Sequence, residues 1–92
     1  MKYEVVTTNQ FRRDMKLAKR RGYDPKLISY VIEELANGNQ LDEKYRDHAL
    51  VGQYNGFREC HISPDWLLVY KIHENELLLI LSRTGTHSDL FR

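Results

Sequence analysis

The 92-residue sequence is poor in cysteine and in long apolar runs, and each shortage excludes a class of protein. The single cysteine, Cys60, can form no internal disulfide and has no cysteine neighbour for a zinc site. The longest apolar runs, such as residues 77–81, are far shorter than the roughly 20 residues that span a bilayer. The end at Met1 has no apolar stretch typical of a signal peptide. We therefore expect a cytoplasmic protein without membrane contact, in which Cys60 has a packing role.

Low-complexity tracts and internal repeats are also absent, and the chain is short. A composition of 41% hydrophobic and 29% charged residues is typical of a folded globular protein rather than of a disordered tail. A chain of this length has room for one modest hydrophobic core. We expect a single domain over residues 1–92, with any functional site built on that core.

The net charge of +1 conceals a marked segregation of charge along the chain. Residues 1–21 hold seven Lys and Arg against two Asp and Glu, a net charge of +5, whereas residues 22–43 hold one against five, a net charge of −4. The basic side chains with helical spacing are Arg12, Arg13, Lys16, Lys19, Arg20 and Arg21. A solvated helix face is the simpler interpretation of this segment alone, and a surface that contacts phosphates is the functional one.

The first half of the chain predicts a short strand followed by two helices. Residues 2–7 alternate weakly and contain β-branched types, which favours a strand. A helix over residues 9–21 is indicated by an apolar stripe, by Thr8 or Asn9 as the N-cap, and by Gly22 at its end. A second helix over residues 25–37 follows Asp24 and Pro25, with Leu27, Ile28, Val31 and Leu35 at helical spacing. The short link between the helices predicts an antiparallel hairpin.

The second half predicts three strands over residues 54–62, 66–72 and 77–84, each rich in β-branched, aromatic or apolar residues. Their short connections permit only antiparallel neighbours, so we expect a meander. Residues 38–53 have no clear period and predict a loop, with one helical turn near residues 43–46. The resulting fold class is α+β, with a short N-terminal strand and a helical hairpin on one face of an antiparallel β-sheet and the other face open.

Candidate catalytic residues gather where the predicted strands end. His61 ends the first strand of the meander, Asp65 follows across the tight turn, Arg83 ends the third strand and His87 comes soon after. The first and third strands of a meander end at the same edge of the sheet, which places these four residues in one neighbourhood. His48, in the long loop, can reach them, but the sequence does not require it to lie there.

Imidazoles, a carboxylate and a guanidinium suit the cleavage of RNA. The 2′-hydroxyl must lose a proton to attack phosphorus, and the 5′-oxygen must gain one as it leaves. Histidine suits both transfers because its ordinary pKa lies near 6.5. Arginine suits the phosphorane because its planar fork donates two hydrogen bonds and stays charged. Aromatic side chains hold splayed bases by stacking, and Tyr54, Trp66 and Phe91 are candidates.

Each candidate also has a structural interpretation. A single histidine at a strand end is usually a surface residue, Asp65 is also a turn former, and Trp66 or Phe91 taken alone suits the core or a C-terminal tether. We interpret Arg58 and Glu59 as a cross-strand surface pair. A divalent-metal set of His48, His61, Asp65 and His87 is the main rival chemistry, but no pair has the spacing of H-E-x-x-H.

Four segments together resemble the YafQ branch of the RelE toxin superfamily. They are YRDHAL at residues 45–50, GFRECHI at 56–62, PDWLLVYK at 64–71 and RTGTHSDLF at 83–91. The resemblance implies a RelE-like fold related to microbial ribonucleases, and a type II toxin that cleaves messenger RNA in the A site of the 70S ribosome. It further implies a 2′,3′-cyclic phosphate product, no metal or other cofactor, contact with ribosomal RNA, and silencing by a cognate antitoxin in a heterotetramer.

The resemblance also implies roles for individual residues. The acid and base residues would be His48, His61, Asp65 and His87, with His87 as the proton donor to the leaving oxygen. Arg83 would stabilise the phosphorane, Arg46 would bind substrate, and Trp66 and Phe91 would shape or stack it. The general base stays open among His48, His61 and Asp65. Glu59, Cys60 and Ala49 stand where relatives differ. The alternative function is a non-catalytic module of the same fold that binds RNA or an antitoxin.

Overall fold

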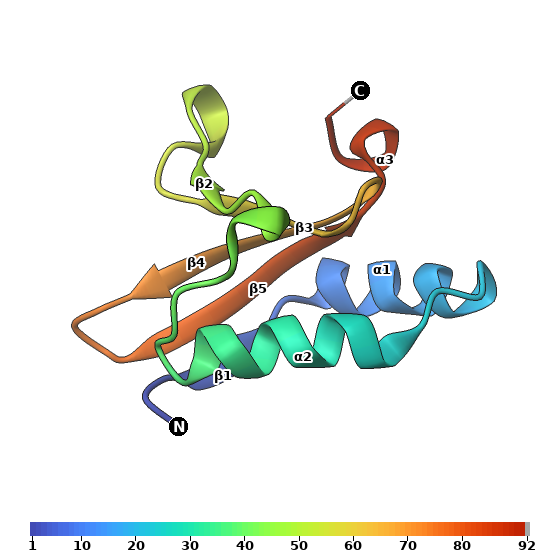
Figure 1. Ribbon diagram of the computed structural model, residues 1–92. Coiled ribbons are helices and arrows are strands. Elements are labelled where there is room, and N and C mark those ends of the chain that lie inside the picture. The colour runs from blue at the N-terminus through green and yellow to red at the C-terminus, as the bar shows by residue number, and fades with distance from the viewer. Residues whose placement is uncertain (92) are drawn as a thin grey trace.

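The computed structural model describes residues 1–91, which form a five-stranded sheet with two long helices on one face (Figure 1). The elements in chain order are β1 (Glu4–Thr7), α1 (Asn9–Arg20), α2 (Pro25–Ala36), the 3₁₀ helix η1 (Glu43–Tyr45), β2 (His48–Ala49), the 3₁₀ helix η2 (Gly52–Tyr54), β3 (Arg58–Ser63), β4 (Trp66–His73), β5 (Leu78–Gly85) and α3 (His87–Phe91). The predicted α+β class is confirmed.

Both long helices begin at the predicted caps. The Thr8 side chain accepts a hydrogen bond from the Phe11 backbone N–H at 3.0 Å, and the Asp24 side chain accepts one from the Lys26 N–H at 2.9 Å. Such caps satisfy backbone donors that have no partner inside the helix. Gly22 follows α1 with a φ of +78°, a conformation that costs a residue without a Cβ little. The predicted helical hairpin is confirmed.

The sheet has the strand order β1-β5-β4-β3-β2. The meander β3-β4-β5 is antiparallel, as predicted, and β2 pairs antiparallel with β3. β1 instead pairs in parallel with β5, so the sheet is mixed and the predicted antiparallel sheet is wrong at this edge. The two strands are separated by both long helices and most of the chain, and only such a long connection allows parallel neighbours.

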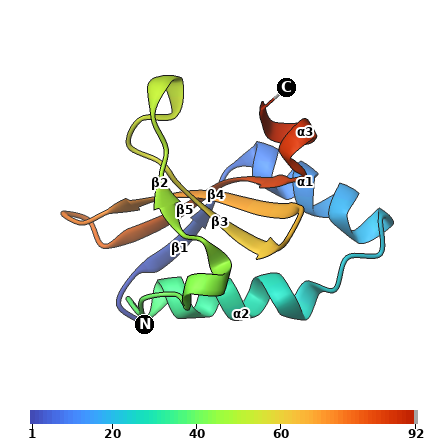
Figure 2. The same ribbon diagram turned by 45° about the horizontal axis from the view of Figure 1, so that its top comes forward.

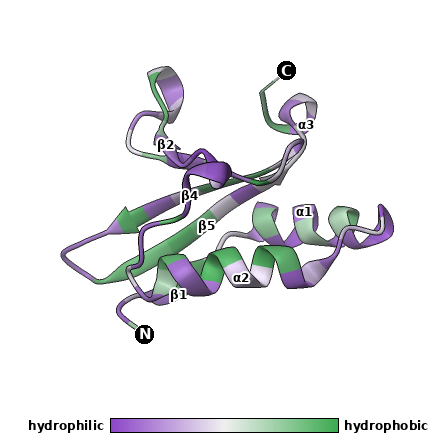
Figure 3. Cartoon of the chain, in the orientation of Figure 1, coloured by the Kyte–Doolittle hydropathy of each residue, from purple (hydrophilic) through white to green (hydrophobic). Residues whose placement is uncertain are grey.

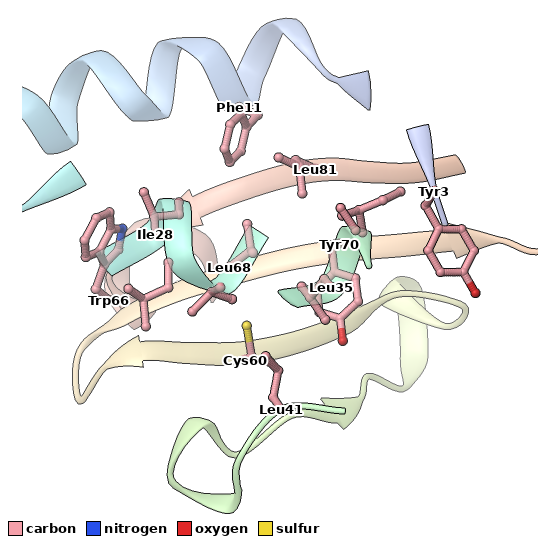
Figure 4. Close-up of a cluster of buried hydrophobic side chains, with 14 of the residues drawn as sticks. Tyr3, Phe11, Ile28, Leu35, Leu41, Cys60, Trp66, Leu68, Tyr70 and Leu81 are labelled. Atoms are coloured by element: carbon pink, nitrogen blue, oxygen red, sulfur yellow. The ribbon is translucent and has the colours of Figure 1, made fainter. Parts of the chain in front are cut away.

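The main core lies between the sheet and the two long helices (Figures 2 and 4). Ile28 and Leu35 of α2 pack against alternate residues of the central strands, including Leu68 and Tyr70. Cys60 is fully buried in this core, so its predicted packing role is confirmed. Figure 3 shows the hydrophobic residues running along β5 and α2, whereas η1 is hydrophilic. Burial of this apolar surface supplies most of the stability of the fold.

The other face of the sheet was predicted to be open, and this is wrong at one end. Leu67 and Val69 of β4 pack against Leu90 of α3, and Phe57 and Phe91 complete this second cluster. In Figures 1 and 2, α3 and the segment that contains η2 both rise from the face opposite the long helices. α3 has five residues, too few to show a helical period in the sequence.

The segment over residues 38–53 is fastened to the sheet at several points. The predicted helical turn is η1, and the chain then forms β2, which was not predicted because it has only two residues. Asp47 anchors the segment, because Tyr70 Oη donates to its carboxylate at 2.5 Å and Arg58 Nη2 does so at 3.4 Å.

Within residues 1–91, no helix has both the length and the apolar character that crossing a bilayer requires.

Candidate active site

Two histidines and a buried glutamate converge on the sheet face opposite the long helices. His48 of β2 lies directly across from Glu59 of β3, and His61 lies two residues further along β3, on the same face. The Nε2 atoms of His48 and His61 both lie 3.6 Å from the same carboxylate oxygen, Glu59 Oε1. Glu59 is 6% exposed, and its carboxylate faces these two imidazoles.

Backbone carbonyls fix how the two imidazoles are turned. His48 Nδ1 lies 2.7 Å from the Arg46 carbonyl oxygen, and His61 Nδ1 lies 3.3 Å from the Pro64 carbonyl oxygen. A carbonyl only accepts, so Nδ1 of each ring must carry the proton that it donates. Nε2, the atom that faces Glu59, holds the lone pair when the ring is neutral and an N–H directed at the carboxylate when the ring is protonated. This arrangement can pass protons between a substrate hydroxyl and the cluster.

Glu59 is the member of this cluster that sequence reasoning missed. The interpretation of Arg58 and Glu59 as a surface pair is wrong, because the two side chains lie on opposite faces of β3 and Arg58 contacts Asp47. The signal in the sequence was the spacing of Glu59 and His61, since residues two apart on a strand share a face. A charged residue inside a strand usually faces solvent. Only the pairing of β2 with β3 shows that Glu59 is covered.

Asp65 and His87 meet beside the same turn. The chain reverses at Pro64 and Asp65 between β3 and β4, and the Asp65 carboxylate accepts a hydrogen bond from the backbone N–H of His87 at 3.3 Å. Asp65 therefore tethers the start of α3 rather than contacting an imidazole. The His87 side chain is exposed, and its ring lies 5.2 Å from that of Phe91. His61 and His87 thus flank one turn, as the strand ends predicted.

A row of aromatic side chains extends from His87 along this face. The ring of Phe91 lies 5.4 Å from that of Tyr54, and Tyr54 lies 6.4 Å from Phe57, both pairs edge-to-face. We call Tyr54, Phe57 and Phe91 the aromatic row. Tyr54 and Phe91, two of the three predicted base platforms, are partly exposed here.

Trp66, the third predicted platform, lies in the main core. Its indole is 3% exposed, packs against Tyr23 with ring centroids 4.9 Å apart, and donates from Nε1 to Thr84 Oγ1 at 2.9 Å. A stacking surface must be open to the base, so the prediction that Trp66 stacks the substrate is wrong for this structure. Trp66 can shape the site only through the strands that it supports.

Arg83 is held by the carboxylate of Asp14 on α1, a residue that no motif in the sequence singles out. Asp14 accepts hydrogen bonds from Arg83 Nε at 2.8 Å, from Arg83 Nη2 at 3.3 Å and from the Thr84 backbone N–H at 3.0 Å. The bond to Asp14 raises the pKa of Arg83 and burial opposes this effect, while Tyr54 and Asp89 are near enough to raise it further. Arg83 therefore sits between α1, α3 and the aromatic row, and no hydrogen bond or ion pair in the described part of the chain joins it to His61.

A clamp between Arg21 and Asp89 holds α3 against the end of α1. Arg21 donates to the Asp89 carboxylate from Nη1 at 2.7 Å and from Nη2 at 3.2 Å, and the backbone N–H of Thr86 donates to Asp89 at 2.8 Å. The hydrogen bond from Arg21, followed by the one from Thr86, lowers the pKa of Asp89 well below its usual range. Because α3 carries His87 and Phe91, this clamp positions both.

Arg46 lies beside the cluster in a left-handed backbone conformation, with φ 50° and ψ 41°. Its carbonyl orients His48, and its exposed side chain lines a pocket that also contains His61.

Cys60 contributes no nucleophile, because burial, followed by Asp47 and Glu59, raises the pKa of its thiol. No group of three or more His, Cys, Asp or Glu side chains within residues 1–91 is arranged to hold a metal ion.

Comparisons with known proteins give the same family from sequence and from structure. The family model described as the YafQ bacterial toxin of type II toxin-antitoxin systems matches residues 3–92. The mRNA interferase toxin YafQ of Escherichia coli K12 is 38% identical over 89 residues, which cover 96% of this chain and 95% of that protein.

Solved structures agree with this similarity. A crystal structure of the E. coli DinJ-YafQ complex contains a chain with a TM-score of 0.89 and 37% identity, covering 98% of this chain and 99% of that chain. A metal-bound toxin from Helicobacter pylori has a TM-score of 0.91 and 44% identity, covering 97% of this chain and 99% of that chain. The match spans nearly the whole of each chain, and the chain described above therefore belongs to the YafQ family of bacterial type II toxins.

Proposed function

We propose that this chain is the toxin of a type II toxin-antitoxin system and an endoribonuclease that cleaves messenger RNA in the ribosomal A site. The observation that carries the proposal is the convergence of His48 and His61 on the buried Glu59, beside the turn that tethers His87. Membership of the YafQ family and the name of the E. coli relative, an mRNA interferase, support it.

The cluster of His48, Glu59 and His61 supplies the general base. With Nδ1 of each imidazole bound to a carbonyl, Nε2 is the atom free to accept the proton of the attacking 2′-hydroxyl. Glu59 then stabilises the positive charge that the protonated imidazole gains, since a nearby carboxylate favours the charged form. Asp65 was an alternative base, but its contact with the His87 backbone suits a positioning role.

His87 is the acid that protonates the leaving 5′-oxygen. It lies across the turn from His61, its side chain is exposed, and its ring is supported by Phe91. The acid and the base must approach the scissile phosphate from different sides, and the two sides of the turn provide this separation. Arg83 stabilises the phosphorane through the guanidinium donors that Asp14 leaves free.

The partners follow from charge and from the relatives. The E. coli YafQ chain crystallises with DinJ, so we propose a cognate antitoxin that covers this site or its surroundings, in a heterotetramer. The basic side chains of α1 are mostly exposed, which suits contact with ribosomal RNA phosphates.

The alternative is a non-catalytic module of the same fold, and a third possibility is metal-dependent hydrolysis, which the metal-bound H. pylori toxin makes worth testing.

The experiment is induced expression in a bacterial host, with messenger 5′ ends mapped at single-nucleotide resolution while translation runs and while it is blocked. His87→Ala is compared with His73→Ala, a matched control at the exposed end of β4.

The expected result is a set of in-frame cuts from wild type and His73→Ala, only during translation, and none from His87→Ala. Cuts by His87→Ala at the wild-type level would remove His87 from the chemistry. No cuts by wild type would favour the binding module. Purified wild type that has been treated with chelator and then freed of it should cleave as before on ribosomes in magnesium buffer. A loss of activity restored only by a transition metal would replace acid-base catalysis with metal-dependent hydrolysis.

A further inference from the structure

A pocket adjoins the histidine cluster at His61, and no residue of the aromatic row lines it. It lies between η1, the turn after β3 and the start of α2, and has a volume of about 490 Å³. Pockets of a few hundred Å³ commonly accept small ligands or single residues of a larger one. His61 lines both this pocket and the proposed catalytic cluster, so a ligand in the pocket lies beside the site of reaction.

The walls of the pocket combine apolar surface with positive charge. Leu27, Tyr45 and Pro64 give apolar surface, while Lys44 and Arg46 from η1 and its end bring two cations. None of the described lining residues is acidic. This combination suits a flat base with a phosphate attached, because an apolar wall accepts the face of a base and the cations accept the phosphate.

The backbone of Arg46 links this pocket to the catalytic cluster. Its left-handed conformation is uncommon for a residue with a Cβ, and such strain persists where the surrounding structure determines it. The same residue offers its carbonyl to His48 Nδ1 at 2.7 Å and its side chain to the pocket. A ligand that contacts Arg46 is thereby held in a fixed relation to His48.

We propose that this pocket is the subsite for the nucleotide immediately 5′ of the cut, the one that carries the attacking 2′-hydroxyl. The inference rests on the proposed function, in which the cluster that includes His61 supplies the base and His87 supplies the acid. The 2′-hydroxyl must lie beside the base, so its own nucleotide occupies the pocket on the His61 side. The nucleotide 3′ of the cut then lies toward His87 and the aromatic row.

The first test measures binding directly by NMR, with isotope-labelled protein titrated with each of the four ribonucleoside 3′-monophosphates and, separately, with inorganic phosphate. We expect the backbone amide shifts of residues 44–46 and 61–63 to move with at least one nucleotide. The affinity should fall about tenfold in Arg46→Asn, a factor that corresponds to about 1.4 kcal/mol. Arg46→Lys should restore much of it. Asn tolerates the left-handed backbone and retains the carbonyl that orients His48.

Two results of this titration would overturn the subsite. One is the absence of shifts in the pocket with all four nucleotides. The other is an equal response to inorganic phosphate, which would mean that the pocket only attracts anions.

The second test measures cleavage on translating ribosomes with A-site sequences that differ at the nucleotide 5′ of the cut. Arg46→Asn and Lys44→Gln should raise KM and weaken the preference at that position, with little change in kcat. Lys26→Gln, an equal loss of charge on exposed α2 surface outside this pocket, should match wild type. If wild type cleaves and the pocket variants share its KM and preference, the subsite is wrong and the proposed function stands.

Other outcomes separate the two proposals. If wild type never cleaves, the proposed function and the subsite both fail, even where nucleotides bind. If the pocket variants cleave as wild type does but escape silencing by a co-expressed antitoxin, the pocket belongs to the protein partner and the RNA subsite is overturned.

Discussion

Glu59 is the residue on which the proposed base depends, because both imidazoles turn Nε2 toward one of its oxygens. Replacing it with glutamine preserves the shape but removes the charge that stabilises a protonated imidazole. We expect Glu59→Gln to lower the rate of cleavage by roughly 100-fold, the lower end of the range for general acid-base catalysis. The measurement is single-turnover cleavage on ribosomes, with circular dichroism as the check on folding. A wild-type rate in Glu59→Gln would mean that the histidines act without it.

Single residues were predictable where their role is local. Thr8, Asp24 and Pro25 mark helix starts because capping involves only neighbours in the chain, and all three act as predicted. Glu59 and Asp14 were not identified, because a charged residue in a strand or a helix is usually solvated, and only distant elements bury these two. The misplacement of Trp66 has the same cause, since the sequence does not reveal which face of β4 meets the long helices.

Among the elements, α1 supports the end of β5 through Asp14. Removing one partner of a mostly buried, hydrogen-bonded ion pair leaves the other without compensation. We expect Asp14→Asn to reduce the free energy of unfolding by about 2 kcal/mol, the scale of a charged hydrogen bond. It should also slow cleavage, because Arg83 loses its fixed position. Urea denaturation measures the first effect and single-turnover cleavage the second. The matched control is Asp24→Asn, which keeps a capping side chain on α2.

α3 is a short element whose position depends on the clamp between Arg21 and Asp89. The pKa of Asp89 lies well below its unfolded value, so the clamp stabilises the protein above that unfolded value and is lost as pH falls through the folded pKa. At neutral pH we expect Asp89→Asn to cost about 1 kcal/mol, as for a well-formed exposed pair. The difference from wild type should shrink below about pH 4, near the ordinary pKa of aspartate. Urea denaturation across pH measures it, and a difference that does not change with pH would refute the clamp.

Besides η2, the elements found only in the structure are the short β2 and α3. Periodicity needs several turns or several alternations to be visible, whereas these elements form because the sheet and the second cluster accept them. Both carry candidate site residues, His48 and His87. The sequence could therefore indicate the candidate histidines but not the backbone that orients them.

In the whole molecule, one face of the sheet forms the main core and the other carries the candidate site. The long helices and the main core occupy one face, and the histidine cluster, α3 and the aromatic row occupy the other. The strand order predicts that the candidate residues gather near one edge of the sheet, because the first and third strands of a meander end at the same edge. That they form an active site stays a prediction. Its partial cover by α3 depends on contacts between distant segments, which the order of the strands alone does not specify.

The segregation of charge along the chain is a property of the whole molecule, because electrostatic attraction acts at a distance and sums over many residues. Lys16, Lys19 and Arg20 are exposed on α1 and lie on one face at helical spacing. If this face contacts ribosomal RNA, each phosphate contact contributes about 0.7 to 0.9 to the slope of log affinity against log salt concentration. Replacing all three residues with glutamine should weaken ribosome binding most at low salt and reduce that slope by about 2.

The measurement is the binding of catalytically silent toxin to ribosomes across a salt series, with the His87→Ala background preventing cleavage. Lys26→Gln on α2 is the control for a general loss of charge, and its slope should remain that of the parent. An unchanged slope in the triple variant would show that these three side chains of α1 are only solvated. The long-range part of the association would then come from the remaining cations, which include Arg12 and Arg13 of α1 and, nearer the site, Lys44, Arg46 and Arg83.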